Sequence, residues 1–178
     1  ELDAHGRRIV TTSTQVPCHV RRIVAQCFQI PVRDIRVIKP RIGGGFGGKQ
    51  EILLEDVCSM LTLVSGLPVL LEYTREEEFV SSRTRHPSLC YTEMGVKNDG
   101  TITGIRLNVV LNTGAYGSHA LTVGSNAGSK VLPMYPCDNI EFSMHSPYTN
   151  LPVGGAYRGY GATQAVFGLE SLVDEAAI

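Results

Sequence analysis

The chain has 178 residues, of which 43% are hydrophobic and 19% are charged. A chain of this size and composition can bury a hydrophobic core without stabilising disulfides or structural metal ions. No stretch approaches the roughly 18 consecutive apolar residues of a membrane span, and the first residues lack the basic-then-apolar pattern of a secretory signal. The five cysteines contain no C-x-x-C pair. We therefore expect free thiols, no membrane partner and a cytoplasmic location.

The net charge of −1 is divided unevenly along the chain. Residues 1–50 hold nine Lys and Arg against three Asp and Glu, whereas residues 51–178 hold seven against fourteen. A nucleic-acid-binding protein usually carries an excess of basic residues over its whole domain, interleaved with aromatic residues. Here the aromatic content is 7% and Trp is absent. This pattern favours a localised anion site and predicts no nucleic-acid partner.

The first predicted elements are a strand, a helix and a second strand. Residues 8–14 are rich in β-formers, and the stripe that follows Pro17 has apolar residues at helical spacing as far as Phe28. Residues 35–38 read as a short buried strand. The strand leads into the first glycine loop, residues 42–49, which holds five of the chain's glycines.

The next predicted elements follow the first glycine loop. Residues 52–64 have apolar side chains on nearly every side and acidic residues in the first turns, which predicts a largely buried helix, with Gly66 as its stop. Residues 67–73 are expected to form a strand and residues 75–82 a short polar helix.

A hairpin is predicted next, because Asn98-Asp99-Gly100 joins two β-type runs at residues 89–96 and 102–112. The Gly- and Pro-rich stretch at residues 113–160 predicts a long ordered loop with only one strand, at residues 140–144. Ordered loops of that length in compact domains tend to be functional.

The last predicted element is a helix over residues 164–178. Asp174 and Glu175 would lie unfavourably at the negative end of its dipole if it stopped there, so we expect a piece of a longer protein. Together the elements predict a mixed α/β fold, a mixed sheet with packed helices, over residues 1–178 without a separate second domain.

One local pattern occurs twice. The first glycine loop and the second glycine loop, residues 155–161, each place an aromatic residue among glycines, in front of a predicted helix. Glycines let the backbone approach a ligand closely, and the free N–H groups at a helix start favour anions. The pair of loops therefore predicts a site for an anionic or oxo group.

Three ligand classes are open for the first glycine loop. The dinucleotide-binding fingerprint is satisfied by Gly43-x-Gly45-x-x-Gly48, and Glu72 could be the acidic residue that binds the ribose hydroxyl. Phe46, however, is large for such a turn. The spacing also fits a phosphate loop, although Gln50 stands where a hydroxyl should hold Mg²⁺. The third class is a metal-oxo cofactor held by backbone N–H groups from both loops and an arginine.

A series of motifs resembles the molybdenum-binding subunit of xanthine dehydrogenases, in the same order and over nearly the whole chain. Aldehyde oxidases, nicotinate dehydrogenases and other molybdenum hydroxylases share the set, so the resemblance indicates the cofactor class more firmly than the substrate. The motifs are TTSTQVP (11–17), IGGGFGGKQE (42–51), EYTREEEF (72–79), RTRHP (83–87), NTGAYG (112–117) and GAYRGYGATQA (155–165).

The resemblance implies a part of the molybdopterin-binding domain and names its cofactor-binding residues. Gly45, Phe46 and Gly47 match the loop whose backbone N–H groups bond the oxo ligands of the molybdenum. Arg158 matches an arginine beside the metal centre, where a fixed positive charge stabilises an anionic oxo site. Phe46 and Arg158 are therefore expected to lie against the molybdenum's ligands, without coordinating the metal themselves.

Three residues are expected to contact the substrate. Tyr160 matches an aromatic that packs on the ring of the bound heterocycle. Gln50 falls where purine-oxidising members carry a glutamate, and an amide can hydrogen-bond there but cannot exchange a proton. Asn126 falls near a position where purine enzymes carry a substrate-binding arginine.

The resemblance implies an oxidoreductase of purine metabolism, which hydroxylates an N-heterocycle with water as the oxygen source. The family's catalytic glutamate lies outside this chain, so no catalytic residue is expected within it and the piece alone should be inactive. Iron–sulfur clusters and FAD are expected on other domains or subunits, which are the partners together with the rest of the molybdenum-binding subunit. A nicotinate- or aldehyde-oxidising enzyme, a nucleotide-binding enzyme and a non-catalytic interaction subunit are the alternatives.

Overall fold

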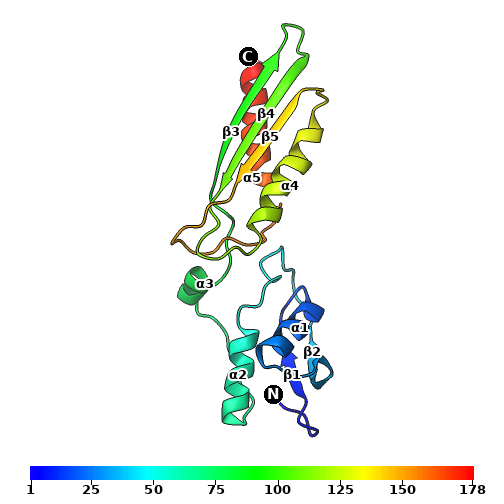
Figure 1. The fold of residues 1–178 in the computed structure, drawn as a ribbon, viewed down its shortest axis with the longest axis vertical. Coiled ribbons are helices and arrows are strands. Elements are labelled where there is room, and N and C mark those ends of the chain that lie inside the picture. The colour runs from blue at the N-terminus through cyan, green and yellow to red at the C-terminus, as the bar shows by residue number, and fades with distance from the viewer. The chain divides into compact units, whose positions relative to one another are not determined.

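The computed structural model describes residues 1–178, which divide into two compact units, Glu1–Ser82 and Arg83–Ile178. Each unit combines helices with a small sheet, so the expected mixed α/β fold is confirmed (Figure 1). None of the helices has the length and apolar character needed to cross a membrane.

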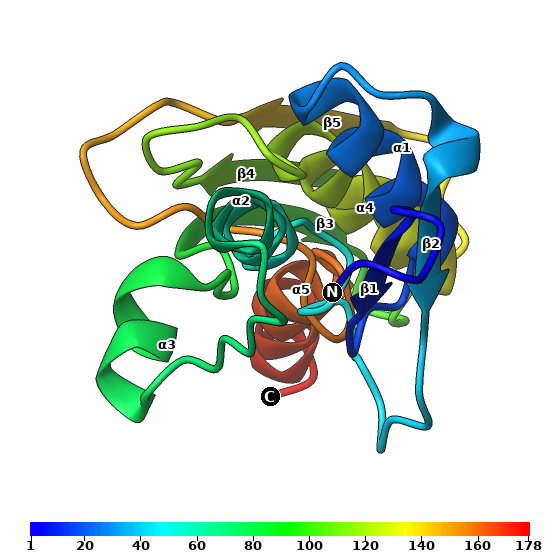
Figure 2. The ribbon, with the colours of Figure 1, turned by 90° about the horizontal axis from the view of Figure 1, so that it is seen from below.

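The first unit starts with the predicted strand–helix–strand arrangement. Strand β1 (Arg8–Thr11) pairs in parallel with β2 (Ile35–Ile38), and helix α1 (Pro17–Cys27) connects them (Figures 1 and 2). Pro17 occupies the first helical position, where its missing N–H costs nothing. The helix buries Val20 and Val24 completely. A single turn of 3₁₀ helix, η1 (Val32–Asp34), leads into β2.

Two helices follow the first glycine loop. Helix α2 (Glu55–Ser65) begins later than the predicted residue 52, because the backbone N–H groups of residues 53 and 54 bond to the carboxylate of Glu55. It ends at Gly66 in the left-handed conformation, as predicted. The short helix α3 (Arg75–Ser81) is confirmed, and a reciprocal capping box between Thr74 and Glu77 starts it.

The strand predicted at residues 67–73 is wrong. The segment is extended but pairs with no strand of this chain. Its side chains do alternate in exposure, and Val69 accepts a hydrogen bond at its carbonyl from the Cys58 thiol. The β pattern is therefore present, but no strand of this chain completes a ladder with it.

The second unit is built on a three-stranded sheet in the order β3-β4-β5. Strands β3 (Ser88–Val96) and β4 (Ile102–Leu111) form the predicted antiparallel hairpin. Strand β5 (Ile140–His145) pairs in parallel with β4. Both expectations, the hairpin and the later single strand, are confirmed.

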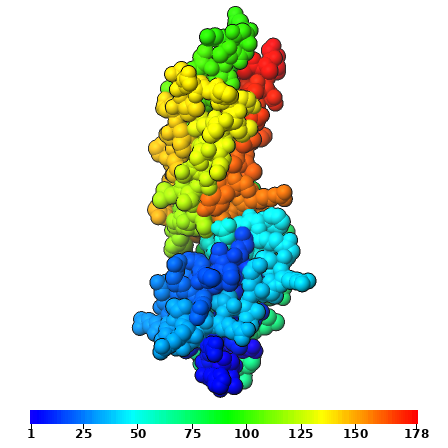
Figure 3. All heavy atoms as spheres, turned by 90° about the vertical axis from the view of Figure 1, so that its right-hand side faces the viewer, coloured from blue at the N-terminus to red at the C-terminus, as the bar shows by residue number.

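Two helices cover one face of this sheet. They are α4 (Ala120–Val131) and α5 (Ala162–Ala176), and α4 forms much of the surface seen in Figure 3 as yellow-green atoms. Buried aliphatic side chains of β4 pack against both helices, because alternate residues of a strand share one face. The central members of this core are Leu107, Val109, Leu111, Val123, Ala127, Ala165 and Leu169.

The prediction of a long loop at residues 113–160 was wrong where α4 lies. The helix contains glycines and small polar residues, which weaken a helix in isolation. Those glycines bring the helix close to the sheet, since a Cβ at Gly124 would lie 2.5 Å from the Met144 sulfur and one at Gly128 would lie 2.6 Å from the Phe142 ring. Packing against β5 therefore stabilises a helix that local propensity disfavours.

Candidate functional site

The first glycine loop folds into two tight turns. The N–H of Gly48 donates to the carbonyl of Gly45 at 2.9 Å, and the N–H of Gln50 donates to the carbonyl of Gly47 at 3.2 Å. Phe46 adopts a positive φ of 48° and is 60% exposed. Its ring folds over Gly44, where any Cβ would lie 2.5 Å from the ring. The loop thus presents an aromatic side chain at its tip.

Gln15, which lies between β1 and α1, fixes this loop through hydrogen bonds. Its Oε1 accepts the N–H of Gly47 at 2.9 Å and the N–H of Lys49 at 3.2 Å. Its own N–H donates to the Lys49 carbonyl at 2.8 Å. The contact is so close that a Cβ at Gly45 would lie 2.3 Å from the Gln15 side chain. Because the amide oxygen is engaged, the Nε2 hydrogens are the donors that Gln15 offers to a ligand.

Gln15 is a candidate site residue that sequence reasoning missed. The motif at residues 11–17 was recognised, but no role was assigned to any side chain in it. The Gly47 N–H, expected to bond an oxo ligand, instead donates to Gln15. The expected role of Gly47 is therefore best understood as part of the frame that holds the Gln15 amide in place.

The first glycine loop is not followed directly by a helix. Helix α2 begins at Glu55, after a stretch of turns, so its N-terminal N–H groups do not lie in the loop. The strand expected to end at Glu72 is absent as well. The local geometry that a dinucleotide or phosphate loop requires, with the glycines opening the helix, is not found here.

The second glycine loop does lead directly into a helix, as predicted, since α5 begins at Ala162. Arg85 holds the loop in place: its guanidinium donates to the carbonyl of Arg158 and to Thr163 Oγ1, and it lies 4.9 Å from the centre of the Tyr157 ring. The Arg158 residue itself is exposed. The backbone that carries Arg158 is therefore positioned by a neighbouring arginine.

Tyr160 is turned toward α4. Its hydroxyl lies 2.6 Å from both His119 Nδ1 and Thr122 Oγ1, and its ring meets the His119 ring edge-on at 5.6 Å. The ring also packs against the buried core of the second unit. These contacts fix the ring's orientation, and its stacking on a substrate stays a prediction.

We expect Tyr160→Phe to lower the free energy of unfolding of the full-length enzyme by about 1–2 kcal/mol, because the hydroxyl loses two partners while the ring keeps its packing. Chemical denaturation measures this change. If the ring also stacks on the substrate, KM should change little, since phenylalanine retains the aromatic face. An unfolding free energy equal to that of the wild type would show that the two short contacts contribute nothing.

Asn126 and Gln50 are both half-buried. Asn126 lies on α4 one turn beyond Thr122, on the side of the helix that meets Tyr160. Gln50 closes the second turn of the first glycine loop through its backbone. The structure thus places Gln50 with Gly45, Phe46 and Gly47 in the first unit, and Asn126 with Tyr160 and Arg158 in the second.

The hydrogen-bond donors among the candidate site residues of the two units suit a cofactor whose metal already carries oxo ligands. No cluster of three or more His, Cys, Asp or Glu side chains could hold a bare metal ion. Oxo ligands instead need N–H donors and positive charge. In the first unit, the Nε2 of Gln15 is such a donor, because the side-chain oxygen of the same residue is fixed to the loop. In the second unit, the exposed Arg158 carries a positive charge. The residues present therefore fit a molybdenum cofactor.

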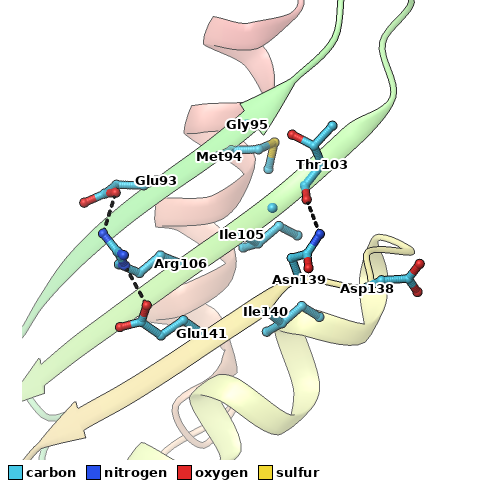
Figure 4. Close-up of a pocket in the computed structure, with 11 residues that line it drawn as sticks. Glu93, Met94, Gly95, Thr103, Ile105, Arg106, Asp138, Asn139, Ile140 and Glu141 are labelled. Carbon is cyan, nitrogen blue, oxygen red and sulfur yellow. Dashed lines mark hydrogen bonds and ion pairs between the residues drawn. The ribbon is translucent and has the colours of Figure 1, made fainter.

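A shallow pocket of about 670 Å³ in the second unit contains none of the predicted site residues (Figure 4). Among the lining residues, Arg106 bridges Glu93 and Glu141 at 2.8 and 3.0 Å on the exposed face of the sheet (Figure 4). The hydrogen bond to Glu141 and the attraction of both carboxylates raise the pKa of Arg106 above its usual value. The charges are thus paired with each other, and we assign this pocket no ligand.

Comparisons with known proteins give the family of this chain. A family model described as the molybdopterin cofactor-binding domain matches residues 1–178. The chain is 46% identical over 171 residues to the probable hypoxanthine oxidase XdhD of Escherichia coli (strain K12), an alignment covering 96% of this chain and 18% of that protein. It is also 46% identical over 177 residues to the putative xanthine dehydrogenase molybdenum-binding subunit XdhA of the same strain, covering 99% of this chain and 24% of that protein.

A solved structure shows the same fold. The aldehyde oxidoreductase from Desulfovibrio desulfuricans ATCC 27774 superposes with a TM-score of 0.91 at 22% identity, covering 99% of this chain and 20% of that chain. The fold of this chain is thus that of one part of that longer protein. The chain belongs to the molybdopterin cofactor-binding domain family. The predicted resemblance, and molybdopterin as the cofactor class, are confirmed, and the chain spans 18% and 24% of the length of the two curated relatives.

Proposed function

We propose that the full-length protein is a xanthine-dehydrogenase-like molybdenum hydroxylase that oxidises an N-heterocycle with water as the oxygen source. The observation that carries the proposal is the Gln15 clamp, which fixes an amide donor beside the exposed Phe46 on a turn built from glycines. A rigid donor of this kind suits the oxo ligands of molybdenum. Two relatives at 46% identity bear the names of a hypoxanthine oxidase and a xanthine dehydrogenase subunit, which favours a purine-like substrate.

The proposed roles divide between binding the cofactor and orienting the substrate. When bound, the cofactor supplies the two-electron oxidation. Gln15 Nε2 and the close backbone of Gly45 and Phe46 would hold its oxo side, Gly47 would keep the Gln15 amide in place through its own N–H, and Arg158 would stabilise the negative charge. The substrate ring is oriented by the residues predicted for that role, Gln50, Asn126 and Tyr160.

The proposal includes partners for electron transfer. Residues 1–178 form one piece of the cofactor-binding domain, and the catalytic base comes from the rest of the subunit. Iron–sulfur clusters and FAD on other domains or subunits accept the electrons, as the family resemblance implies. The isolated piece is therefore expected to be inactive, and the working enzyme to act in the cytoplasm.

The substrate is tested by assaying the intact enzyme, with its molybdenum content measured, against hypoxanthine, xanthine, nicotinate and aldehydes. We expect the highest kcat/KM on a purine. Because Gln50 can hydrogen-bond but not exchange a proton, we expect Gln50→Glu to shift the preference among purines more than it changes the molybdenum content. Turnover of nicotinate or aldehydes alone would contradict the proposal of a purine substrate. An enzyme that purifies without molybdenum would contradict the proposal of a molybdenum hydroxylase.

We expect Arg158→Ala in the intact enzyme to lower kcat roughly 100-fold or more, because it removes a fixed charge from the site. Stability should change by less than about 1 kcal/mol, since the side chain is exposed and alanine keeps the carbonyl that Arg85 binds. Steady-state kinetics and thermal unfolding measure the two effects. Arg158→Lys is the matched control, which keeps the charge. Wild-type turnover by Arg158→Ala would remove Arg158 from the site.

A further inference from the structure

Tyr160 is held in a backbone conformation that suits glycine. Gly159, Tyr160 and Gly161 have φ of 90°, 42° and 92°, three consecutive positive values. Glycine adopts such angles freely, whereas a bulky side chain rarely does. Ser118, the residue before His119, also has a positive φ, of 24°. Both sides of the contact between Tyr160 and His119 thus carry backbone strain, which persists only where the surrounding structure holds it and is frequent at binding sites.

The hydrogen bonds of this contact run in one direction. The Thr122 hydroxyl donates its one hydrogen to the His119 carbonyl at 3.0 Å, since a carbonyl can only accept. The Tyr160 hydroxyl, 2.6 Å from Thr122 Oγ1, is then the donor of that pair. The Tyr160 oxygen is left to accept from His119 Nδ1, also at 2.6 Å, so this ring nitrogen carries a hydrogen. The chain of donors therefore starts at the His119 ring and ends at the His119 carbonyl.

This chain attaches the phenol of Tyr160 to the first turn of α4. The carbonyl at its end also accepts the N–H of Val123 at 2.9 Å, so the last acceptor belongs to the start of the helix. His119, Thr122 and Asn126 are spaced by three and four positions, which places them on one side of the helix. The angle of the Tyr160 ring is therefore set relative to Asn126, the other residue of this unit that we propose for the substrate.

We propose that His119 is a positioning residue that sets the orientation of the substrate through Tyr160. The inference rests on the proposed function, in which the Tyr160 ring stacks on the heterocycle. Without the N–H of His119 the ring keeps its packing against the core, and with it the area available for stacking, but its angle is no longer fixed. Misalignment of the reacting groups lowers the rate of the chemical step. The loss therefore belongs in kcat and not in KM.

A double-mutant cycle in the molybdenum-loaded full-length enzyme, assayed with hypoxanthine and xanthine, tests this role. We expect His119→Leu to lower kcat roughly 10-fold and to leave KM nearly unchanged. Tyr160→Phe removes the same contact and should lower kcat to a similar extent. The double variant should then be no slower than either single variant, whereas residues that act independently multiply their effects. His145→Leu, at an exposed histidine of β5, is the matched control and should keep the wild-type kcat.

The direction of the hydrogen bonds is tested by two further replacements of His119. Asparagine places an N–H close to the position of Nδ1, so His119→Asn should recover most of the kcat that His119→Leu loses. Aspartate has the same shape but can only accept, so His119→Asp should be as slow as His119→Leu. The comparison separates a donated hydrogen bond from packing alone, because both side chains fill the same space.

Three outcomes would overturn the proposal. They are a folded His119→Leu variant with wild-type kcat, a double variant whose loss is the product of the two single losses, and equal activity of His119→Asn and His119→Asp. The last applies even where the leucine variant does not fold. Tyr160→Ala distinguishes this failure from that of the proposed function. A raised KM in Tyr160→Ala shows that the ring contacts the substrate whatever His119 does, whereas wild-type KM and kcat would contradict the stacking itself.

Discussion

Replacing Gln15 by alanine in the full-length enzyme is expected to lower kcat by roughly 100-fold or more, the usual effect of removing a preorganised donor. Alanine removes the oxygen that accepts the N–H groups of Gly47 and Lys49, so the turn that carries Phe46 loses its clamp. It also removes the Nε2 donor. Steady-state kinetics and the molybdenum content of the purified variant measure the two consequences separately.

Gln15→Glu separates the two roles of this side chain. A carboxylate still accepts the N–H groups of Gly47 and Lys49, but it offers no donor and adds a negative charge. If Gln15 donates to an anionic cofactor, Gln15→Glu should be at least as damaging to activity as Gln15→Ala. If Gln15 only shapes the loop, Gln15→Glu should retain most of the activity. Full activity in both variants would remove Gln15 from the site.

The second large effect is expected at Gly161, where the second glycine loop enters α5. Gly161→Ala should lower the free energy of unfolding by about 3–5 kcal/mol. The residue has φ of 92°, which strains any side chain, and its Cβ would lie 2.0 Å from the backbone carbonyl oxygen of Val123. A backbone oxygen cannot turn aside, so α4 and α5 would have to separate. Chemical denaturation of the full-length enzyme measures the loss.

Gly104→Ala is the matched control in the same unit. Gly104 lies in β4, has no positive φ, and its Cβ would meet the nearest atom at 3.7 Å, an ordinary contact. We expect this variant to remain within about 1 kcal/mol of the wild type. A Gly161→Ala variant as stable as the control would mean that α4 and α5 are less closely packed than the structure has them.

Local signals predicted most of the elements. Pro17 at a helix start, Gly66 at a helix end and the Asn98-Asp99-Gly100 turn each determine the backbone within a few residues, so sequence alone places them. The parallel pairing of β1 with β2 follows from a helix between two short strands. These features need no knowledge of distant contacts.

Two of the wrong predictions, the loop where α4 lies and the strand at residues 67–73, depend on contacts between distant residues. Helix α4 has glycines that disfavour a helix locally, and the contacts with Met144 and Phe142 that explain them come from a later strand. The segment at residues 67–73 has the pattern of a strand, but a strand needs a neighbour to form a ladder. In both cases the deciding contact is absent from the local sequence.

The candidate site was predicted in outline only. Glycine-rich loops with an embedded aromatic are visible in the sequence, and the resemblance of the motifs to molybdenum-binding subunits implied the roles of Phe46 and Arg158. Gln15 has no such signal, because its role depends on contacts with Gly47 and Lys49, more than 30 residues later in the chain. The role of Arg85 was missed for the same reason, since it acts on the carbonyl of Arg158.

We propose that both glycine loops take part in binding the molybdenum cofactor. The most direct test is a crystal structure of the cofactor-loaded full-length enzyme, with the metal located by anomalous scattering at the molybdenum edge. We predict a single molybdenum peak whose ligands lie within hydrogen-bonding reach of Gln15 Nε2 and beside the Arg158 guanidinium. A peak next to only one of the two loops, or remote from both, would contradict the account.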